Sequence, residues 1–97
     1  MLVMNQDGDE LVPFKSSFFI KTETRRVNRE KIVYAKIRAI RFPEIHLGDY
    51  SSGEYNVITL GEYRGKERAK EILREIFDIY STGATLTYEM PERNYRD

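Results

Sequence analysis

Residues 66–80, KERAKEILREIFDIY, decide the fold of this 97-residue chain. Their apolar side chains recur three and four positions apart, which in an α-helix places them in one stripe along one side. Gly65 before the stretch is a permissible N-cap, and residues 81–83 after it are typical of a helix end. The sequence therefore predicts a helix whose whole stripe is covered by a sheet. The stripe consists of Ala69, Ile72, Leu73, Ile76, Phe77 and Tyr80.

Residues 32–42 form the strongest predicted strand. Apolar and polar side chains alternate along it, so one face is expected in the core and the other in solvent. Residues 18–23 and 55–60 are predicted strands because they are rich in aromatic and β-branched side chains. The charged residues 24–31 are expected to form a loop, and Gly61 is expected to end the third strand. The 32–42 strand is predicted to turn Val33, Ala35, Ile37 and Ala39 inward, and Tyr34, Lys36 and Arg38 outward.

Short strands are predicted near both ends of the chain. Residues 2–4 and 11–12 flank Asp7-Gly8, a pair that favours the tight turn of a β-hairpin. Residues 85–88 are expected to form a last strand, and the polar residues 91–97 a flexible tail. Together these elements predict a single α+β domain over residues 1–90. In it, a curved antiparallel sheet of about five strands packs against one C-terminal amphipathic helix.

The composition excludes several kinds of chemistry. Sixteen basic and 16 acidic residues leave no net charge, so no strong overall field attracts a polyanion or a membrane. The absence of cysteine excludes disulfides and thiolate chemistry, and it fits a reducing cytoplasm. The apolar runs are too short to span a bilayer, and acidic residues near the start argue against a secretory leader. We therefore expect a soluble cytoplasmic protein that does not contact membranes.

No group of side chains indicates catalysis. His46, the single histidine, lies in the predicted loop 44–53 without further nitrogen or thiolate ligands, so it is best interpreted as a surface histidine. Residues 5–9 resemble a calcium-binding loop in composition, but that spacing would place Val3 at the first ligand position. The sequence thus predicts no catalytic residue, no metal site and no cofactor, and it argues against an enzyme.

The candidate binding surface lies between residues 19 and 41. If the strands around residues 20 and 36 pair, their basic and aromatic side chains share one sheet face, which is typical of single-stranded nucleic-acid binding. An ordinary solvated face, partly neutralised by acidic residues, is the alternative interpretation. The predicted binding residues are Phe19, Lys21, Tyr34, Lys36 and Arg38.

Four segments together resemble a family of small uncharacterised proteins from Firmicutes genomes and their prophages. They are NQDG at 5–8, LGEY at 60–63, ERAKEIL at 67–73 and YEMPE at 88–92. The resemblance covers the first dozen residues and most of 55–92. Members of the family usually carry Thr or Ser where this chain has Gly65, and the loop 44–53 is longer here. The resemblance implies a source and an α+β fold, but no activity.

Three functions remain open at this point. A non-catalytic protein-interaction module of phage or prophage type is favoured by the small size, the segregated charges and the resemblance. Nucleic-acid binding through the basic face and small-molecule binding between helix and sheet are the alternatives. The expected partner is another protein, and the chain is expected to be a monomer or a homodimer. The helix is expected only to close the core, with function on the outer sheet face.

Overall fold

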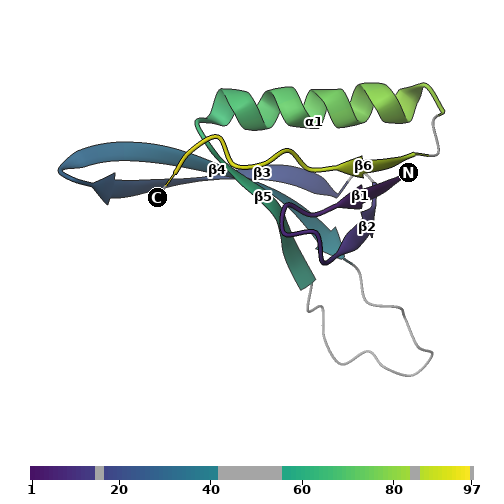
Figure 1. Ribbon diagram of the computed structural model, residues 1–97, viewed down its shortest axis with the longest axis horizontal. Helices are drawn as coiled ribbons and strands as arrows, with labels where there is room; N and C mark the ends of the chain where they lie inside the picture. Colours follow the sequence, from purple (N-terminus) through teal and green to yellow (C-terminus); the bar gives the residue numbers. More distant parts are fainter. Residues whose placement is uncertain (15–16, 42–55, 84–85, 97) are drawn as a thin grey trace.

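The fold is α+β and is divided between two small sheets (Figure 1). The computed structural model describes residues 1–14, 17–41, 56–83 and 86–96. One sheet has the strand order β2-β1-β6 and the other has the order β3-β4-β5. The α+β prediction is confirmed, but the strands do not form one sheet of about five. The elements are β1 (Leu2–Met4), β2 (Leu11–Pro13), β3 (Phe18–Val27), β4 (Glu30–Arg41), β5 (Asn56–Arg64), α1 (Lys66–Ser81) and β6 (Thr87–Glu89).

The smaller sheet contains the predicted N-terminal hairpin. β1 and β2 pair antiparallel with Val3 opposite Val12, and Gly8 in the connecting turn has a φ of 75°. β6 then adds to the other side of β1 in parallel, with Val3 opposite Tyr88. The expectation of a wholly antiparallel sheet is therefore wrong. Parallel neighbours need a long crossover connection, and the chain between β1 and β6, which includes α1, supplies it.

The β3–β4 hairpin is longer than predicted. Residues 24–31 form no loop, because β3 continues to Val27, which lies opposite Glu30 at the start of β4. Only Asn28 and Arg29 make the turn, and their φ angles are 52° and 69°. Two residues with positive φ match the twist of the flanking strands, and asparagine tolerates this conformation well. A tight turn inside a charged segment thus extends both strands.

β5 also continues past its predicted end. Gly61 lies within the strand, opposite Ile37, and β5 ends only at Arg64. A Cβ atom at Gly61 would lie 2.8 Å from the hydroxyl of Tyr63, whose ring is fully buried. The missing side chain therefore makes room for the tyrosine ring. The pairing of β4 and β5 shifts between Ile37 and Arg38, where β5 carries an extra residue in the manner of a β-bulge.

The helix covers one face of the larger sheet (Figure 1). It occupies nearly the predicted range, and Ala69, Ile72 and Ile76 are fully buried. The outer part of the predicted stripe is not covered, because Phe77 and Tyr80 are 58% and 48% exposed. The expectation that the whole stripe packs under the sheet is wrong for these two residues. Within the described residues, no helix is long and apolar enough to cross a membrane.

Candidate functional site

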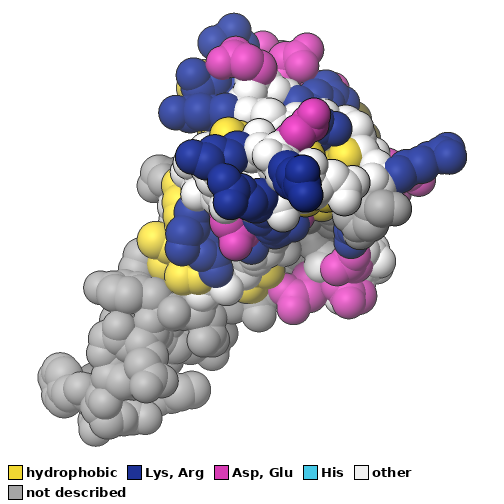
Figure 2. Space-filling view, turned by 90° about the vertical axis from the view of Figure 1, so that its left-hand side faces the viewer, with side chains coloured by type: hydrophobic (Ala, Val, Ile, Leu, Met, Phe, Trp, Pro, Cys, Tyr) yellow, Lys and Arg dark blue, Asp and Glu magenta, His cyan; other side chains and the backbone are white. Residues whose placement is uncertain are grey.

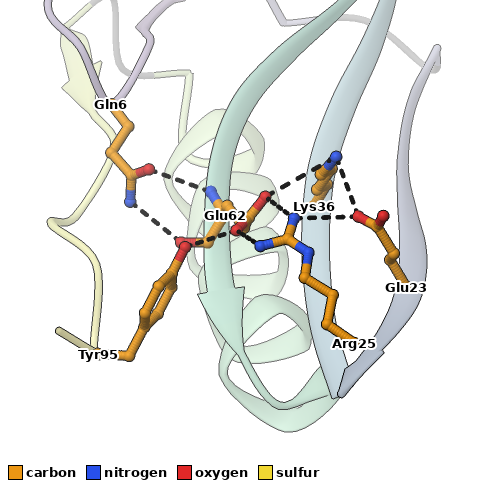
Figure 3. Close-up of polar contacts among 6 residues, drawn as sticks. All are labelled: Gln6, Glu23, Arg25, Lys36, Glu62 and Tyr95. Atoms are coloured by element: carbon orange, nitrogen blue, oxygen red, sulfur yellow. Dashed lines mark hydrogen bonds and ion pairs between the residues drawn. The ribbon is translucent and has the colours of Figure 1, made fainter. Parts of the chain in front are cut away.

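A network of ion pairs covers the outer face of the β3-β4-β5 sheet, opposite α1 (Figure 3). Its centre is the carboxylate of Glu62 on β5. Both terminal nitrogens of Arg25 on β3 donate to the two oxygens of this carboxylate, at 3.0 and 2.9 Å. Such a two-pronged pair is the strongest geometry for a guanidinium and a carboxylate. Arg25 also donates to Glu23 at 3.0 Å, so one arginine joins two acids.

Lys36 on β4 lies between the same two acids. Its Nζ is 3.3 Å from Glu23 and 3.8 Å from Glu62. The hydrogen bonds and charges of Arg25 and Lys36 lower the pKa of Glu23 below its usual value. For Glu62, desolvation raises the pKa, but hydrogen bonds from Arg25 and Tyr95 and the two positive charges outweigh it. The net direction is again downward, so both carboxylates stay ionised in the fold.

Aromatic and amide side chains complete this network from the chain ends. The hydroxyl of Tyr95 donates to Glu62 at 2.5 Å. The side chain of Gln6 accepts from the N–H of Glu62 at 3.1 Å and donates to its carbonyl (Figure 3). Tyr34 is only 7% exposed, because its ring centre lies 4.5 Å from the Arg25 guanidinium and 5.0 Å from the Tyr95 ring. The segment after β6, expected to be a flexible tail, makes these contacts through Tyr95.

The five predicted binding residues lie on this outer face, as the β3–β4 register places Phe19 opposite Arg38 and Lys21 opposite Lys36. Lys21, Lys36 and Arg38 line a depression of about 320 Å³ together with Thr22 and Glu23. The Nε of Arg38 is buried there without a hydrogen-bond partner among the described residues. Tyr34, in contrast, offers little ring surface on which a base could stack. Figure 2 looks onto the hairpin end, where Lys and Arg side chains gather with Asp and Glu between them.

Of the residues considered as metal ligands, Asn5 and Asp9 form a turn, and His46 lies outside the described residues. The side-chain oxygen of Asn5 accepts from the N–H groups of Asp9 and Glu10, and its amide donates to Asp9 at 2.6 Å. This segment is therefore held as a turn, as its sequence predicts. In the part of the chain that the structure describes, no three His, Cys, Asp or Glu side chains converge as metal ligands. His46 and the loop 44–53 lie outside the described residues.

A second candidate site lies between α1 and β3, where the small-molecule alternative expects a pocket, but none of its lining residues was predicted as a binding residue. It is a groove of about 500 Å³ with five apolar residues and two cations along it. Phe14 closes one end, since its ring centre lies 4.9 Å from that of Phe18 and 5.1 Å from that of Tyr80. The sequence feature that could have indicated these residues is the wide apolar stripe of the helix, because the sheet leaves Phe77 and Tyr80 of that stripe exposed. The lining residues are Phe14, Phe18, Ile20, Lys70, Leu73, Arg74 and Phe77.

Comparisons with family models, with curated proteins and with solved structures returned no match. The resemblance to small proteins of Firmicutes genomes and prophages therefore stays a prediction. Two surfaces remain as candidates for function, the outer face of the β3-β4-β5 sheet and the α1–β3 groove.

Proposed function

We propose that this protein is a non-catalytic protein-interaction module, of phage or prophage type, that acts in the cytoplasm. Its docking surface in this proposal is the α1–β3 groove, and the partner supplies an apolar segment that carries a carboxylate. The observation that carries the proposal is the row of apolar side chains left uncovered between helix and sheet. The absence of cysteine from the chain supports a reducing compartment.

The apolar lining supports a partner with large hydrophobic side chains. Phe77 is more than half exposed and faces Phe14, Phe18 and Ile20 across the groove. Burying a phenylalanine side chain stabilises a complex by about 1.5–3 kcal/mol. Contiguous apolar surface rimmed by polar groups is typical of interaction sites. The groove is open along the helix, which suits an extended or helical segment better than an enclosed ligand.

The two cations on α1 favour an acidic residue in that segment. Lys70 is only loosely paired, with its Nζ 3.9 Å from a highly exposed Glu67. Arg74 has no ion-pair partner among the described residues. Among the described residues, the groove lining contains two cations and no acidic side chain, which favours a carboxylate brought by the partner. Charge complementarity of this kind orients a partner and speeds its encounter.

Selection of peptides from a random displayed library against the immobilised protein tests the proposal. We expect the selected peptides to share large apolar residues next to Asp or Glu. Phe77→Asp should weaken their binding by about tenfold or more, because it places a charge in the apolar lining. Arg74→Glu should also weaken it and reduce its salt dependence. Leu86→Asp is the matched control, since Leu86 is 70% exposed and lies outside the groove.

The outcome separates three explanations. Peptides that bind wild type and Phe77→Asp equally, or a library that yields none, contradict the proposed surface. Circular dichroism of each variant verifies that a loss of binding is not a loss of fold. If the library yields no peptide, but decanoate, an apolar carboxylate, binds wild type and not Phe77→Asp, the small-molecule alternative is favoured instead.

The second candidate function is nucleic-acid binding through the outer face. It is favoured by the depression that brings Lys21, Lys36 and Arg38 together. Fluorescence anisotropy with an oligo-dT probe tests it over a range of salt concentrations. Lys36→Glu combined with Arg38→Glu should abolish binding whose affinity falls steeply with salt. Absent or salt-independent binding contradicts this candidate.

A further inference from the structure

The outer edge of β3 is an unusually long free edge. β3 is the terminal strand in the order β3-β4-β5, and it spans ten residues. The N–H of Ile40 donates to the carbonyl of Ser17. The backbone groups of odd-numbered residues in this strand therefore face β4, while those of even-numbered residues face outward. Among the described residues, none of these outward groups has a hydrogen-bond partner. They belong to Phe18, Ile20, Thr22, Thr24 and Arg26.

The opposite edge of the same sheet is covered along residues 60–64. The N–H of Gln6 donates to the carbonyl of Leu60, and the Gln6 side chain bonds both backbone groups of Glu62. The side chain of Asn94 bonds both backbone groups of Arg64, at 2.7 and 3.0 Å. Two amide side chains thus take the place of a neighbouring strand along β5. Exposed edges promote pairing with another chain, and this chain blocks residues 60–64 of one edge and leaves the β3 edge open.

We propose that β3 pairs antiparallel with β3 of a second copy of this chain, around a two-fold axis at Thr22. This inference goes beyond the proposed function, because it concerns assembly through the sheet edge. A second copy is the favoured occupant because the strand is complementary to itself in this register. Lys21 comes opposite Glu23 of the second copy, and by symmetry the same pair forms twice. Phe19 comes opposite Arg25, which allows a contact between ring and guanidinium.

Other registers match less well. An axis at Lys21 sets this lysine against itself, and an axis at Glu23 sets two carboxylates against each other. Like charges directly opposite one another destabilise a pair of strands. An axis at Thr24 does pair Glu23 with Arg25, but it joins a shorter part of the strand. The Thr22 axis uses nearly all of β3 and satisfies every outward backbone group from Phe18 to Arg26.

Pairing in this register also extends the groove. On the helix side of the sheet it places Arg26 of the second copy opposite Phe18, which lines the groove. The groove then gains a second wall and a further cation from the neighbouring copy. A single chain leaves that side of the groove open to solvent.

Charge-swap variants test the proposal by analytical ultracentrifugation over a wide concentration range. We expect wild type to form a concentration-dependent dimer. Lys21→Glu and Glu23→Lys should each weaken dimerisation by about tenfold, since each opposes like charges twice. The double variant K21E/E23K should restore the dimer, because its charges are again complementary. Thr22→Pro should abolish dimerisation, as it removes an outward N–H while leaving the ladder to β4 intact.

The double variant distinguishes a lost contact between copies from a lost ion pair within one chain. Glu23→Lys also loses the ion pairs of Glu23 with Arg25 and Lys36, and the double variant loses them too. Restored dimerisation in the double variant therefore cannot come from restored folding. A wild type that stays monomeric at every concentration overturns the proposal, and so does a dimer that ignores these charges. Peptide binding by a monomeric protein would retain the proposed function and reject only this assembly.

Discussion

The two faces of the β3-β4-β5 sheet are covered by different means. On the inner face, Ala35 and Ile37 of β4 are fully buried with α1 against the sheet. On the outer face, Tyr34 and Lys36 of the same strand are covered by ion pairs and by Tyr95. The stability of the inner face depends on close packing, which many combinations of apolar side chains can provide. The outer face depends on particular partners around Glu62, so the two faces should respond differently to substitution and to pH.

The largest loss of stability is expected from truncating a buried side chain on the inner face. Ile37→Ala removes a fully buried side chain, so we expect the free energy of unfolding to fall by about 2–5 kcal/mol. Urea denaturation followed by circular dichroism measures it. Val33→Ala on the same strand is the matched control, because Val33 is 42% exposed and should cost far less. Equal losses at the two positions would contradict the described packing.

Removing the charge at the centre of the outer face should have the next largest effect. Glu62→Gln leaves Arg25 without its two-pronged acceptor, and we expect a loss of about 1–3 kcal/mol in unfolding free energy. Glu71→Gln serves as the control, since this exposed helix residue has only a loose pair with Arg68 at 3.6 Å. If both variants unfold like wild type, the network adds nothing to stability.

The same network should make stability depend on acid. The pKa values of Glu23 and Glu62 lie below the ordinary 4.5 in the folded chain, so the unfolded chain binds protons more readily. The stabilisation is thus complete above about pH 4.5 and is lost as the pH falls through the lowered folded-state values. Urea titrations at several pH values should show this decline. In Glu62→Gln the decline should be shallower, whereas an identical profile would exclude Glu62 as its source.

The smallest effect is expected from a single hydroxyl. Tyr95→Phe removes the hydrogen bond to Glu62 but keeps the ring against Tyr34, so we expect a loss of about 0.5–1.5 kcal/mol. Tyr80→Phe is the control, because none of the described residues forms a hydrogen bond with the exposed Tyr80 hydroxyl. A loss confined to Tyr95→Phe means that the last residues stay on the sheet in solution. No loss would favour the flexible tail expected from the sequence.

Local patterns predicted the elements that depend on neighbours in sequence. The periodicity of residues 66–80 predicted α1, and the Asp7-Gly8 pair predicted the first hairpin. The turn at Asn28 and Arg29 was missed because nothing in a run of charged residues distinguishes two positive φ angles from a loop. The strand end predicted at Gly61 was wrong for a related reason. Gly61 lies within the strand because the Tyr63 side chain leaves no room for a Cβ atom there, and it does not mark a turn.

The candidate sites were predictable to different degrees. Alternation along β3 and β4 was enough to place Phe19, Lys21, Lys36 and Arg38 on one face. It did not reveal that Glu62, 37 residues after Arg25, would bind that arginine across β4. A carboxylate from a distant strand reaches this face only through sheet order and register. A pocket between helix and sheet was one of the alternatives from the sequence, but its lining residues were not predicted. Periodicity identifies the apolar side of a helix but not how much of that side the sheet covers.

The sequence by itself determined the α+β class, the helix, its apolar stripe and the separation of inner from outer face on β4. These features follow from residue spacing within one element, where the period of 3.6 or two fixes the direction of each side chain. Only the tertiary structure decided that the strands divide between two sheets and that Lys36 and Arg25 are paired with acids. It also decided that Phe77 stays exposed beside a free edge of β3. Those outcomes depend on which distant segments become neighbours. Strand order and register decide this through backbone hydrogen bonds, which the spacing of residues within one element does not predict.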